Sequence, residues 1–371
     1  MSFVEKVRVT VIGAGIVGLA IASALAERYD GVYILEKNWK AGLEGSTHNS
    51  GVIHSGIHYP PGSLKAKLCV KGNRMIYDIC SRNGVDFRRT GKLTVASWEQ
   101  ESVIEKLRHQ GEENGVPGLE ILDSKEISEI EPLVKADIAL FTPTSGIVDQ
   151  SQLLDHFYSK FMRSGGTLVT DSRVDSVRKR GNFYEVSGVS RGGRFSFLSG
   201  AVINSAGLYA EHIARTAGID VDSNGYRTEY WKGDYYRIEG DLAISTLVYP
   251  VPEDKGLGIH MTPDTTGSLR LGPNSYRVDE INFNVETDQE QFMTEAEKYI
   301  PSIRSYRLSP DFAGIRTKIK GNGFRDFVIR EESEKGLEGF INLIGIESPG
   351  LTASPAIAEL VLEMYSSIVD R

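Results

Sequence analysis

The sequence predicts an α/β protein, α+β overall, with a parallel-sheet domain and a second domain built on a mostly antiparallel sheet. An apolar run, Val9–Ile12, leads into glycines in G-x-G-x-x-G spacing, and Ile16–Ala26 follows with the Ala/Leu-rich pattern of a helix packed on a sheet. A second apolar run, Val32–Leu35, ends in an acid. Much later, Tyr226–Asn274 alternates aromatic and β-branched residues with turn residues, which is typical of antiparallel hairpins.

The glycines near the start of the chain predict a nucleotide-binding turn. Gly13 permits a tight turn, Gly15 lets the backbone approach a pyrophosphate, and Gly18 lets helix and strand pack closely. The pyrophosphate would lie at the N-terminus of the following helix, whose N–H groups and dipole favour an anion. Glu36, at the end of the second apolar run, stands where ribose hydroxyls need an acceptor. The first domain is therefore predicted to be Rossmann-like and to bind a dinucleotide.

Length and composition limit the classes of protein that fit. The 371 residues suffice for roughly two domains, and 40% hydrophobic with 25% charged residues is ordinary for a globular chain. A net charge of −8 provides no basic field for nucleic acid. No apolar run approaches the ~18 residues that span a bilayer, and the chain enters its first strand almost at once, so neither a membrane span nor a signal peptide is expected. Cys69, Cys80 and the scattered histidines fit no metal pattern.

A polar loop, Gly42–Gly56, follows the predicted ribose acceptor. Its sequence, GLEGSTHNSGVIHSG, combines glycines with small polar residues and two histidines. Long glycine-rich loops inside a compact domain are usually functional, and hydrogen-bonding side chains of this size suit a segment that wraps a planar ligand. The alternative is a surface loop with a helix cap. Because the loop directly follows the dinucleotide motif, we expect it to contact the bound molecule.

Periodicity and turn residues predict the remaining elements in order. Helices are predicted at Ser63–Asn83, Glu99–Asn114, Gln152–Ser164, Asn284–Ile300 and Thr352–Met364, and from near Tyr209. Asp123 and Glu126 form a capping-box pattern, and Pro132 ends the helix that they start. Strands are predicted at Phe87–Ala96, Gly166–Val174, Val177–Lys179, Ala201–Ala206, Gly233–Ile238, Leu247–Val251, Gly258–Thr262, Ser268–Leu271 and Phe340–Ile346. Hairpin turns are predicted at Pro252–Gly256 and Asp264–Gly267.

One long stretch carries a family resemblance. His48–Gly72, HNSGVIHSGIHYPPGSLKAKLCVKG, resembles the signature of the L-2-hydroxyglutarate dehydrogenase group, FAD-dependent oxidoreductases of the D-amino-acid-oxidase-like superfamily. Between Leu271 and Ser309 this chain is shorter than larger family members, which bears on substrate identity more than on fold. Matching stretches along nearly the whole chain are GKLTVA (Gly91–Ala96), NGVPGLEIL (Asn114–Leu122), SGIVD (Ser145–Asp149), SAGLYA (Ser205–Ala210), YPVP (Tyr249–Pro252), GIHMTP (Gly258–Pro263), LGPN (Leu271–Asn274), AGIR (Ala313–Arg316) and DFVI (Asp326–Ile329).

The resemblance implies an FAD cofactor held by a discontinuous FAD-binding domain. Its segments would be residues 1–80, 142–222 and 310–371, and residues 81–141 and 223–309 would form the substrate domain. The backbone near Val174 would approach the adenine, and GIESPGLTASPAIAE resembles a flavin motif in which a helix N-terminus stabilises negative charge on the reduced ring. The residues implied to bind FAD are Gly13, Gly15, Ile16, Val17, Gly18, Glu36, Lys37, Thr47, His48, Asn49, Ser50, Gly51, Val174, Ala206, Gly207, Gly314, Arg316, Gly345, Pro349, Gly350, Leu351 and Thr352.

The same resemblance implies that the antiparallel sheet lies opposite the flavin and binds substrate. Arg316 would anchor a carboxylate, because arginine forms bidentate pairs with such anions, and Tyr249 would help to hold it. His54 or His260 would accept the hydroxyl proton, since histidine titrates near neutral pH. The expected reaction oxidises a small, L-2-hydroxyglutarate-like 2-hydroxy acid to the 2-oxo acid, with hydride passing to flavin N5. For Tyr249 and His260 the alternative is a structural place in a half-buried sheet.

Rival activities stay open within the superfamily. NSGVIHSGIHY and AGIR also resemble flavin-dependent glycerol-3-phosphate dehydrogenase, where Arg316 and a lysine would hold the phosphate, and an amine oxidase of the glycine or sarcosine type shares the fold. An RNA-binding or partner-binding flavoprotein has no basic or low-complexity segment to support it. The expected partners are a small anionic substrate and an electron acceptor, namely oxygen, a quinone or a carrier protein, without nucleic acid. The expected location is the cytoplasm, where a quinone acceptor would favour peripheral contact with the inner face of the membrane.

Overall fold

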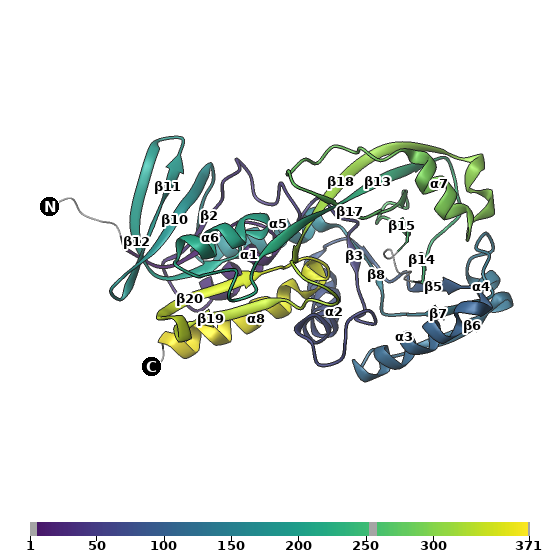
Figure 1. Ribbon diagram of the computed structural model, residues 1–371, viewed down its shortest axis with the longest axis horizontal. Helices are drawn as coiled ribbons and strands as arrows, with labels where there is room; N and C mark the ends of the chain where they lie inside the picture. Colours follow the sequence, from purple (N-terminus) through teal and green to yellow (C-terminus); the bar gives the residue numbers. More distant parts are fainter. Residues whose placement is uncertain (1–5, 252–257, 370–371) are drawn as a thin grey trace. The chain divides into compact units, whose positions relative to one another are not determined.

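The computed structural model describes residues 6–251 and 258–369 (Figure 1). Its internal contacts divide the chain into two compact units, each assembled from separate stretches of sequence. Unit 1 comprises Met1–Thr47, Gln150–Tyr230 and Arg316–Arg371, and unit 2 comprises His48–Asp149 and Trp231–Ile315. The predicted turn at 252–256 lies outside the described residues.

The unit bounds differ from the domain limits expected from the sequence. Residues 48–80 and 142–149 belong to unit 2, although the sequence analysis assigned them to the FAD-binding domain. The reason is local hydrogen bonding. Asn73 Nδ2 and Tyr77 Oη, on the helix that spans 64–83, both donate to Thr144 O, at 2.9 and 3.0 Å. These bonds hold the helix and the segment around residue 144 together within unit 2.

A sheet with a parallel centre forms unit 1. Its strand order is β10-β11-β12-β1-β2-β9, and β20 pairs with β12 and with β19. The pairs β20–β12, β12–β1, β1–β2 and β2–β9 are parallel, and β10–β11, β11–β12 and β19–β20 are antiparallel. The strands are β1 (Lys6–Ile12), β2 (Val32–Leu35), β9 (Thr167–Val169), β10 (Ser172–Arg180), β11 (Phe183–Ser190), β12 (Gly193–Asn204), β19 (Val328–Glu332) and β20 (Leu337–Ile344).

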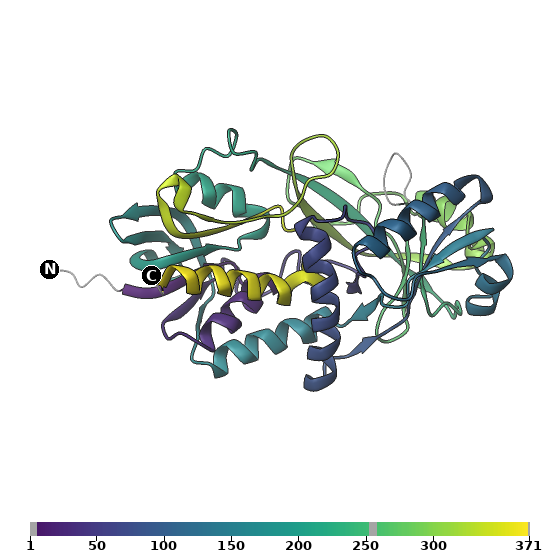
Figure 2. The same ribbon diagram turned by 90° about the horizontal axis from the view of Figure 1, so that it is seen from below.

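Three long helices of unit 1 pack against one another. Helix α1 contacts both α5 and α8, and Figure 2 shows α8, in yellow, running alongside α1. Because α1 is apolar almost all round, it is buried on nearly every side, as its sequence IVGLAIASALA predicts. The helices are α1 (Ile16–Ala26), α5 (Gln150–Arg163), α6 (Ala210–Thr216) and α8 (Gly350–Val369), with short 3-10 turns η2 (Gly207–Tyr209) and η4 (Ser333–Lys335). This arrangement confirms the predicted Rossmann-like α/β fold.

Unit 2 is built on a second, mostly antiparallel sheet, as predicted. Its order is β17-β13-β16-β15-β14-β5-β7-β6, and β18 pairs with β13. Strands β14 and β5 form a parallel pair inside it. A small sheet, β3-β8-β4, accompanies it. The strands are β3 (Val52–Ile53), β4 (Phe87–Arg88), β5 (Lys92–Ala96), β6 (Glu120–Asp123), β7 (Ile138–Phe141), β8 (Gly146–Val148), β13 (Thr228–Glu239), β14 (Leu247–Pro250), β15 (Met261–Pro263), β16 (Leu269–Leu271), β17 (Tyr276–Val278) and β18 (Arg307–Ile319).

The helices of unit 2 follow local capping rules. Ser63 Oγ accepts the N–H of Ala66 at 3.1 Å and starts α2, which ends at the left-handed Gly84. Asp123 and Glu126 form the predicted capping box of α4. Helix α3 contacts β7 (Figure 1). The helices are α2 (Leu64–Asn83), α3 (Glu101–Glu113), α4 (Ser124–Ile130) and α7 (Gln289–Glu297), with 3-10 turns η1 (Trp98–Gln100) and η3 (Pro301–Ser305).

The two faces of the large sheet in unit 2 have different chemistry. Leu93 and Val95 of β5 and Val248 of β14 point into an apolar core that also contains Phe292 of α7. Because side chains alternate along a strand, Lys92 and the residues in register with it lie on the opposite face. That face carries Lys92, Thr94, Leu247 and Tyr249. One face therefore stabilises the fold and the other is available for chemistry.

Several predicted elements have different bounds in the structure. The helix expected at 284–300 begins only at Gln289, because Asp288 caps it by accepting the N–H of Glu290 at 2.9 Å. The strand expected at 87–96 is divided by Gly91, which has φ of +66°. The strand expected at 166–174 is interrupted at Asp171, with φ of +49°, so that β10 starts afresh at Ser172. Of the strand expected at 258–262, only the part from Met261 belongs to β15.

Candidate active site

The glycine turn after β1 is a cradle in which added side chains would collide with the backbone. A Cβ on Gly13 would lie 2.5 Å from Ser205 O, and a Cβ on Gly18 would lie 2.1 Å from Gly13 O. Gly13 also has φ of +99°, a conformation that favours glycine. A Cβ on Gly15 would lie 3.0 Å from Ser46 Oγ. The turn thus brings bare backbone to the N-terminus of α1, which suits a pyrophosphate.

Glu36 is held at the end of β2 by two backbone amides. Its Oε2 accepts the N–H of Ala14 and its Oε1 accepts the N–H of Asn38, both at 2.8 Å. Burial raises the pKa of Glu36, while these two hydrogen bonds act in the opposite direction. Each carboxylate oxygen retains a lone pair. Glu36 can therefore accept hydrogen bonds from the hydroxyls of a ribose beside the glycine turn.

The other residues predicted in unit 1 to bind FAD lie at the same edge of its sheet. Gly13 follows β1, Glu36 follows β2, Ala206 and Gly207 follow β12, and Gly345 follows β20. The register Leu35↔Ile12↔Asn204↔Asn342 brings these four strand ends together. In open α/β sheets, ligands bind outside the carboxyl ends of the parallel strands. Pro349 precedes α8, and Gly350, Leu351 and Thr352 form its first turn. Val174 lies buried in β10.

Residues on either side of the boundary between the units carry the remaining predicted FAD contacts. In unit 1, Ile16 and Val17 begin α1, Lys37 forms an ion pair with Glu44 and lies 4.0 Å from the ring centroid of Tyr209, and Thr47 Oγ1 donates to Gly42 O at 2.8 Å. In unit 2, Asn49 Oδ1 accepts the N–H of Gly51 at 2.9 Å, in the turn that contains Ser50. A Cβ on Gly314 would lie 2.4 Å from His48 O.

A cluster of titratable side chains lies at the face of the large sheet in unit 2 that carries Lys92 and Tyr249. We call it the Lys92 cluster, and its members are His54, His58, Lys92, Tyr249 and His260. Lys92 Nζ lies 2.9 Å from His58 Nε2 and 5.2 Å from the ring centroid of Tyr249. The Tyr249 and His260 rings stack with centroids 3.5 Å apart and an interplanar angle of 9°. His54 and His260 both lower the pKa of His58 through their charge, so both are close to it.

Burial determines the protonation of this cluster. It lowers the pKa of Lys92 from 10.5 to about 7, and with the charge of Lys92 it lowers that of His54 to about 3. The pKa of His58 is also lowered, first by burial and then by Lys92. Burial raises the pKa of Tyr249, which stays a neutral phenol. At neutral pH, His54 and His58 are therefore neutral bases beside one lysine, and an anion bound near them would raise their pKa.

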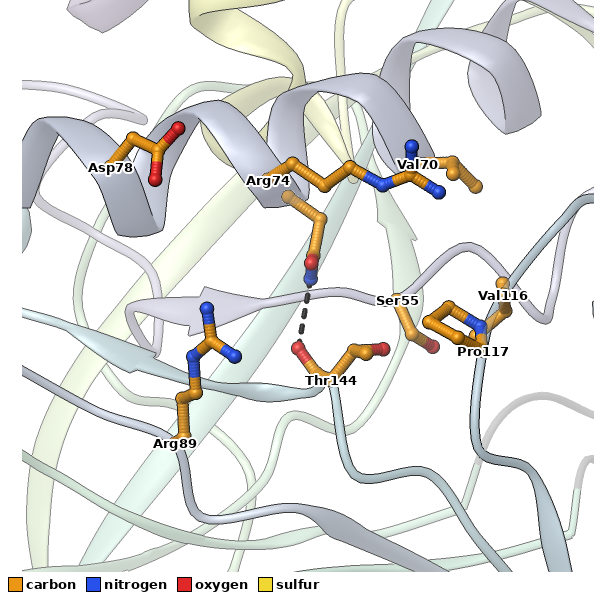
Figure 3. A pocket seen from close by; sticks show the side chains of 9 residues that line it. Ser55, Val70, Arg74, Asp78, Arg89, Val116, Pro117 and Thr144 are labelled. Carbon is orange, nitrogen blue, oxygen red and sulfur yellow. Dashed lines mark hydrogen bonds between the residues drawn. The ribbon is translucent and has the colours of Figure 1, made fainter.

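The backbone of His54 is held from behind by α2. Asn73 Nδ2 donates to His54 O at 2.9 Å, and the Cys69 thiol contacts the same oxygen at 3.5 Å. Asn73 also lines a pocket of about 290 Å³ whose wall includes Ser55, Arg74 and Arg89 (Figure 3). The dashed line that ends at Thr144 in Figure 3 is the hydrogen bond that Asn73 Nδ2 donates to Thr144 O. Asn73 thus positions the loop that carries His54.

The structure brings three of the predicted site residues together and places the fourth in the other unit of the chain. His54, Tyr249 and His260 come together in the Lys92 cluster. Arg316 lies half-buried in β18 and is the first residue of the last segment of unit 1. Its role as the substrate anchor stays a prediction. In the described part of the chain, no three His, Cys, Asp or Glu side chains come together as metal ligands would.

Sequence reasoning missed two members of the cluster, His58 and Lys92. Both lie inside stretches that carried the family resemblance, but neither was singled out. One signal was available for Lys92, because it opens the apolar run KLTVA, all of whose residues are buried. A lysine in a buried strand is unusual unless it is paired. No signal in the sequence connects it with His58, which is 34 positions earlier.

Comparisons with known proteins agree with the family resemblance of the sequence and with the fold. The family model described as "FAD dependent oxidoreductase" matches residues 8–364. L-2-hydroxyglutarate dehydrogenase, mitochondrial, from Arabidopsis thaliana is 35% identical over 97% of this chain and 84% of that protein. Glycerol 3-phosphate dehydrogenase from Caloramator mitchellensis is 30% identical over 98% and 74%. The structure of dithionite-reduced L-alpha-glycerophosphate oxidase from Mycoplasma pneumoniae, with FAD bound, matches with a TM-score of 0.87 and 26% identity over 98% and 95%.

Proposed function

Since this chain belongs to the DAO family of FAD-dependent oxidoreductases, we propose that it oxidises a small 2-hydroxy acid of the L-2-hydroxyglutarate type to the 2-oxo acid. FAD, when bound, accepts the two electrons and the hydrogen released by the substrate carbon. The cradle at Gly13 and Gly18 and the carboxylate of Glu36 fit the pyrophosphate and a ribose of this cofactor. Relatives at 30% identity or above that act on this substrate, by their names, support the choice.

The Lys92 cluster is the observation that carries the proposal. Oxidation of an alcohol requires a group that takes the hydroxyl proton, and a neutral imidazole does this well. His54 is neutral, and its carbonyl is fixed by Asn73. His260 is fixed by stacking on Tyr249. One of these two histidines accepts the proton, and binding of an anionic substrate raises its basicity. Arg316 holds the carboxylate at C1 through a bidentate pair.

The choice between the two histidines is tested by flavin reduction. In His54→Gln and His260→Gln holoenzymes, the rate of flavin bleaching by L-2-hydroxyglutarate is measured anaerobically in a stopped-flow instrument. The variant that lacks the proton acceptor should reduce at least ~100-fold more slowly and lose the pH dependence of the step. The other should change less than ~10-fold. If neither variant slows bleaching by ~10-fold, the histidine mechanism is wrong.

A second candidate is the oxidation of glycerol 3-phosphate, and a third is the oxidation of glycine or sarcosine. The oxidation of glycerol 3-phosphate is supported by the Caloramator mitchellensis relative and by Lys92, a cation beside the candidate bases that would suit a phosphate. Anaerobic bleaching of the yellow protein distinguishes the three. Reduction by L-2-hydroxyglutarate alone supports the proposal, whereas reduction by glycerol 3-phosphate alone or by an amine alone replaces it.

We further propose that the reduced flavin is reoxidised by oxygen, a quinone or a carrier protein. Rates of reoxidation with air, with a soluble quinone and with an electron-transfer protein rank these acceptors directly. No helix among residues 6–251 and 258–369 combines the length and apolar character needed to cross a bilayer. The cytoplasmic location and the peripheral membrane contact stay predictions, and the Arabidopsis relative carries the word mitochondrial in its name.

A further inference from the structure

Lys92 is a buried lysine for which the described residues supply no acidic partner. Its exposed fraction is 1%, and its Nζ lies 2.9 Å from a histidine nitrogen, not from a carboxylate. Among the described residues, no Asp or Glu oxygen lies within 4 Å of Lys92 Nζ. Lysines are almost never fully buried unless they are paired. Lys232, also 1% exposed and also in unit 2, follows that rule, because its Nζ lies 3.0 Å from Glu286.

The neighbours of Lys92 in the described part of the chain add no compensating charge. His54 and His58 are neutral, and burial keeps the Cys69 thiol and the Tyr249 phenol neutral as well. The only charge that Lys92 and these neighbours can carry near neutral pH is therefore positive. A buried cation is unfavourable by itself and becomes favourable when an anion with good hydrogen-bond geometry meets it. The cluster is thus complementary to an anionic group.

The place of Lys92 in the sheet connects it with the candidate bases. Lys92, Thr94 and Tyr249 lie on one face of the β5–β14 pair, and His260 stacks on Tyr249 at that face. Thr94 Oγ1 is fully buried and has no hydrogen-bond partner among the described residues. A buried hydroxyl of this kind is a further group that an oxygen-rich ligand would satisfy. One bound molecule can therefore contact a histidine at its hydroxyl carbon and Lys92 at another point.

We propose that Lys92, held by its hydrogen bond to His58, receives the acidic group at the far end of the substrate and so selects 2-hydroxy acids that carry a second carboxylate. This inference rests on the proposed function, in which Arg316 holds the first carboxylate. The second carboxylate of a dicarboxylate supplies an anion to Lys92, whereas a hydroxy acid with an apolar end leaves Lys92 uncompensated. The preference for a dicarboxylate follows from burial, because a buried charge that is left without its partner has an unfavourable free energy.

Two substrates of equal chain length test the proposal. L-2-hydroxyglutarate ends in a carboxylate and L-2-hydroxyvalerate ends in a methyl group. In the wild-type holoenzyme, kcat/KM should favour the dicarboxylate. In Lys92→Met, which keeps most of the length of the side chain and removes its charge, the ratio of the two kcat/KM values should fall by about 10- to 100-fold, mainly through KM for L-2-hydroxyglutarate. Lys232→Met is the matched control, and it should leave the ratio as it is.

A binding measurement keeps the inference separate from the chemistry. Glutarate and valerate lack the hydroxyl and cannot be oxidised, and their Kd values are read from the shift that they cause in the flavin absorption band. Lys92→Met should raise the Kd of glutarate by about 10- to 100-fold and bring it close to the Kd of valerate. Equal losses for both ligands, or equal falls of both kcat/KM values, would show that Lys92 serves folding or proton transfer and would overturn the inference.

The outcomes also separate this inference from the proposed function. If the wild type is bleached by no 2-hydroxy acid, the proposed function fails, and the glutarate and valerate titrations still decide whether Lys92 binds a carboxylate. If glycerol 3-phosphate alone bleaches it, the same variant is compared on glycerol 3-phosphate and glycerol. A loss of that preference in Lys92→Met assigns the phosphate to Lys92 and overturns the assignment of a carboxylate.

Discussion

Asn73 Nδ2 lies 2.9 Å from the backbone oxygen of His54 and 2.9 Å from that of Thr144. One buried amide on α2 therefore fixes the loop that carries a candidate base. Asn114 does the same for the next part of this loop, because its Nδ2 donates to Gly56 O at 3.0 Å and to Tyr59 O at 2.8 Å. The two asparagines hold His54 and His58 separately.

The first prediction concerns these two amides. Asn73→Leu should slow flavin reduction by L-2-hydroxyglutarate by about 10-fold, because a small displacement of a reacting group has a large effect on rate. Asn114→Leu should act on KM for the dicarboxylate instead, because it loosens His58 and through it Lys92. Each variant removes two hydrogen bonds to backbone oxygens, so both should lower Tm by a few degrees. Stopped-flow reduction and steady-state KM, measured on both variants, check this division. Identical kinetic defects would contradict it.

The second prediction concerns Glu36. Glu36→Ala removes the acceptor of the Ala14 and Asn38 amides together with the proposed ribose acceptor. The Kd of FAD for the apoprotein, followed by quenching of flavin fluorescence, should rise by about 10- to 100-fold. Glu27→Ala is the control, because Glu27 is half-exposed and pairs with Lys160 on the surface. If both variants bind FAD as the wild type does, Glu36 has no part in the cofactor site.

The third prediction compares a glycine that has a close backbone neighbour with one that has only a left-handed backbone conformation. Gly13 has φ of +99° and a backbone oxygen 2.5 Å from any added Cβ, whereas Gly62 has φ of +82° and open space around it. Gly62→Ala should therefore show only the penalty of the left-handed backbone, about 1–2 kcal/mol. Gly13→Ala should in addition displace the turn and abolish FAD retention through purification. The absorbance ratio of flavin to protein measures retention, and full retention in Gly13→Ala would refute the cradle.

The fourth prediction concerns pH. The pKa of Lys92 falls from 10.5 to about 7 on folding, so between these values the unfolded chain holds more protons than the folded chain. The free energy of unfolding of the wild type should therefore rise with pH across this window. Below about pH 7 the full destabilisation by the buried charge is present. Lys92→Met lacks this contribution. Its Tm should exceed that of the wild type at pH 7, and the difference should shrink towards pH 9.5.

The groups that face Lys92 determine how clearly this effect appears. They are His54, His58, His260, Tyr249 and Cys69. The pKa values of His54 and His58 are lowered and those of Tyr249 and Cys69 are raised, so these four stay neutral through the window. Repeating the comparison in a His260→Gln background removes the fifth group. A Tm difference that is constant from pH 7 to pH 9.5 would mean that Lys92 does not titrate there.

Local rules in the sequence predicted much of the fold. The strand, glycine turn and helix around Gly13, the helix expected at 63–83 and the Asp123 capping box of α4 each depend on neighbouring residues, and all are confirmed. Some bounds were wrong. The helix expected from residue 284 starts at Gln289, because Asp288 caps it there.

The candidate site divides in the same way. The family resemblance implied roles for the histidines at 54 and 260. Lys92, whose charge adds to burial in lowering the pKa of His54, reaches the face that carries Tyr249 through the pairing of β5 with β14. No pattern along the chain reveals that pairing, because it joins strands about 150 positions apart in the parallel sense. Tertiary pairing, not composition, therefore produced the feature from which most of the function is argued.

The alternation along β5 has an evolutionary consequence. Leu93 and Val95 belong to the apolar core, whereas Lys92 and Thr94 belong to the opposite face. Under the proposed role of Lys92, point changes at 92, 94 or 249 would alter substrate preference and leave the apolar core unchanged. Insertion or deletion of one residue in this strand would exchange the two sets and ruin both. Substrate preference can therefore change by substitution in β5, but not by a change in the length of this strand.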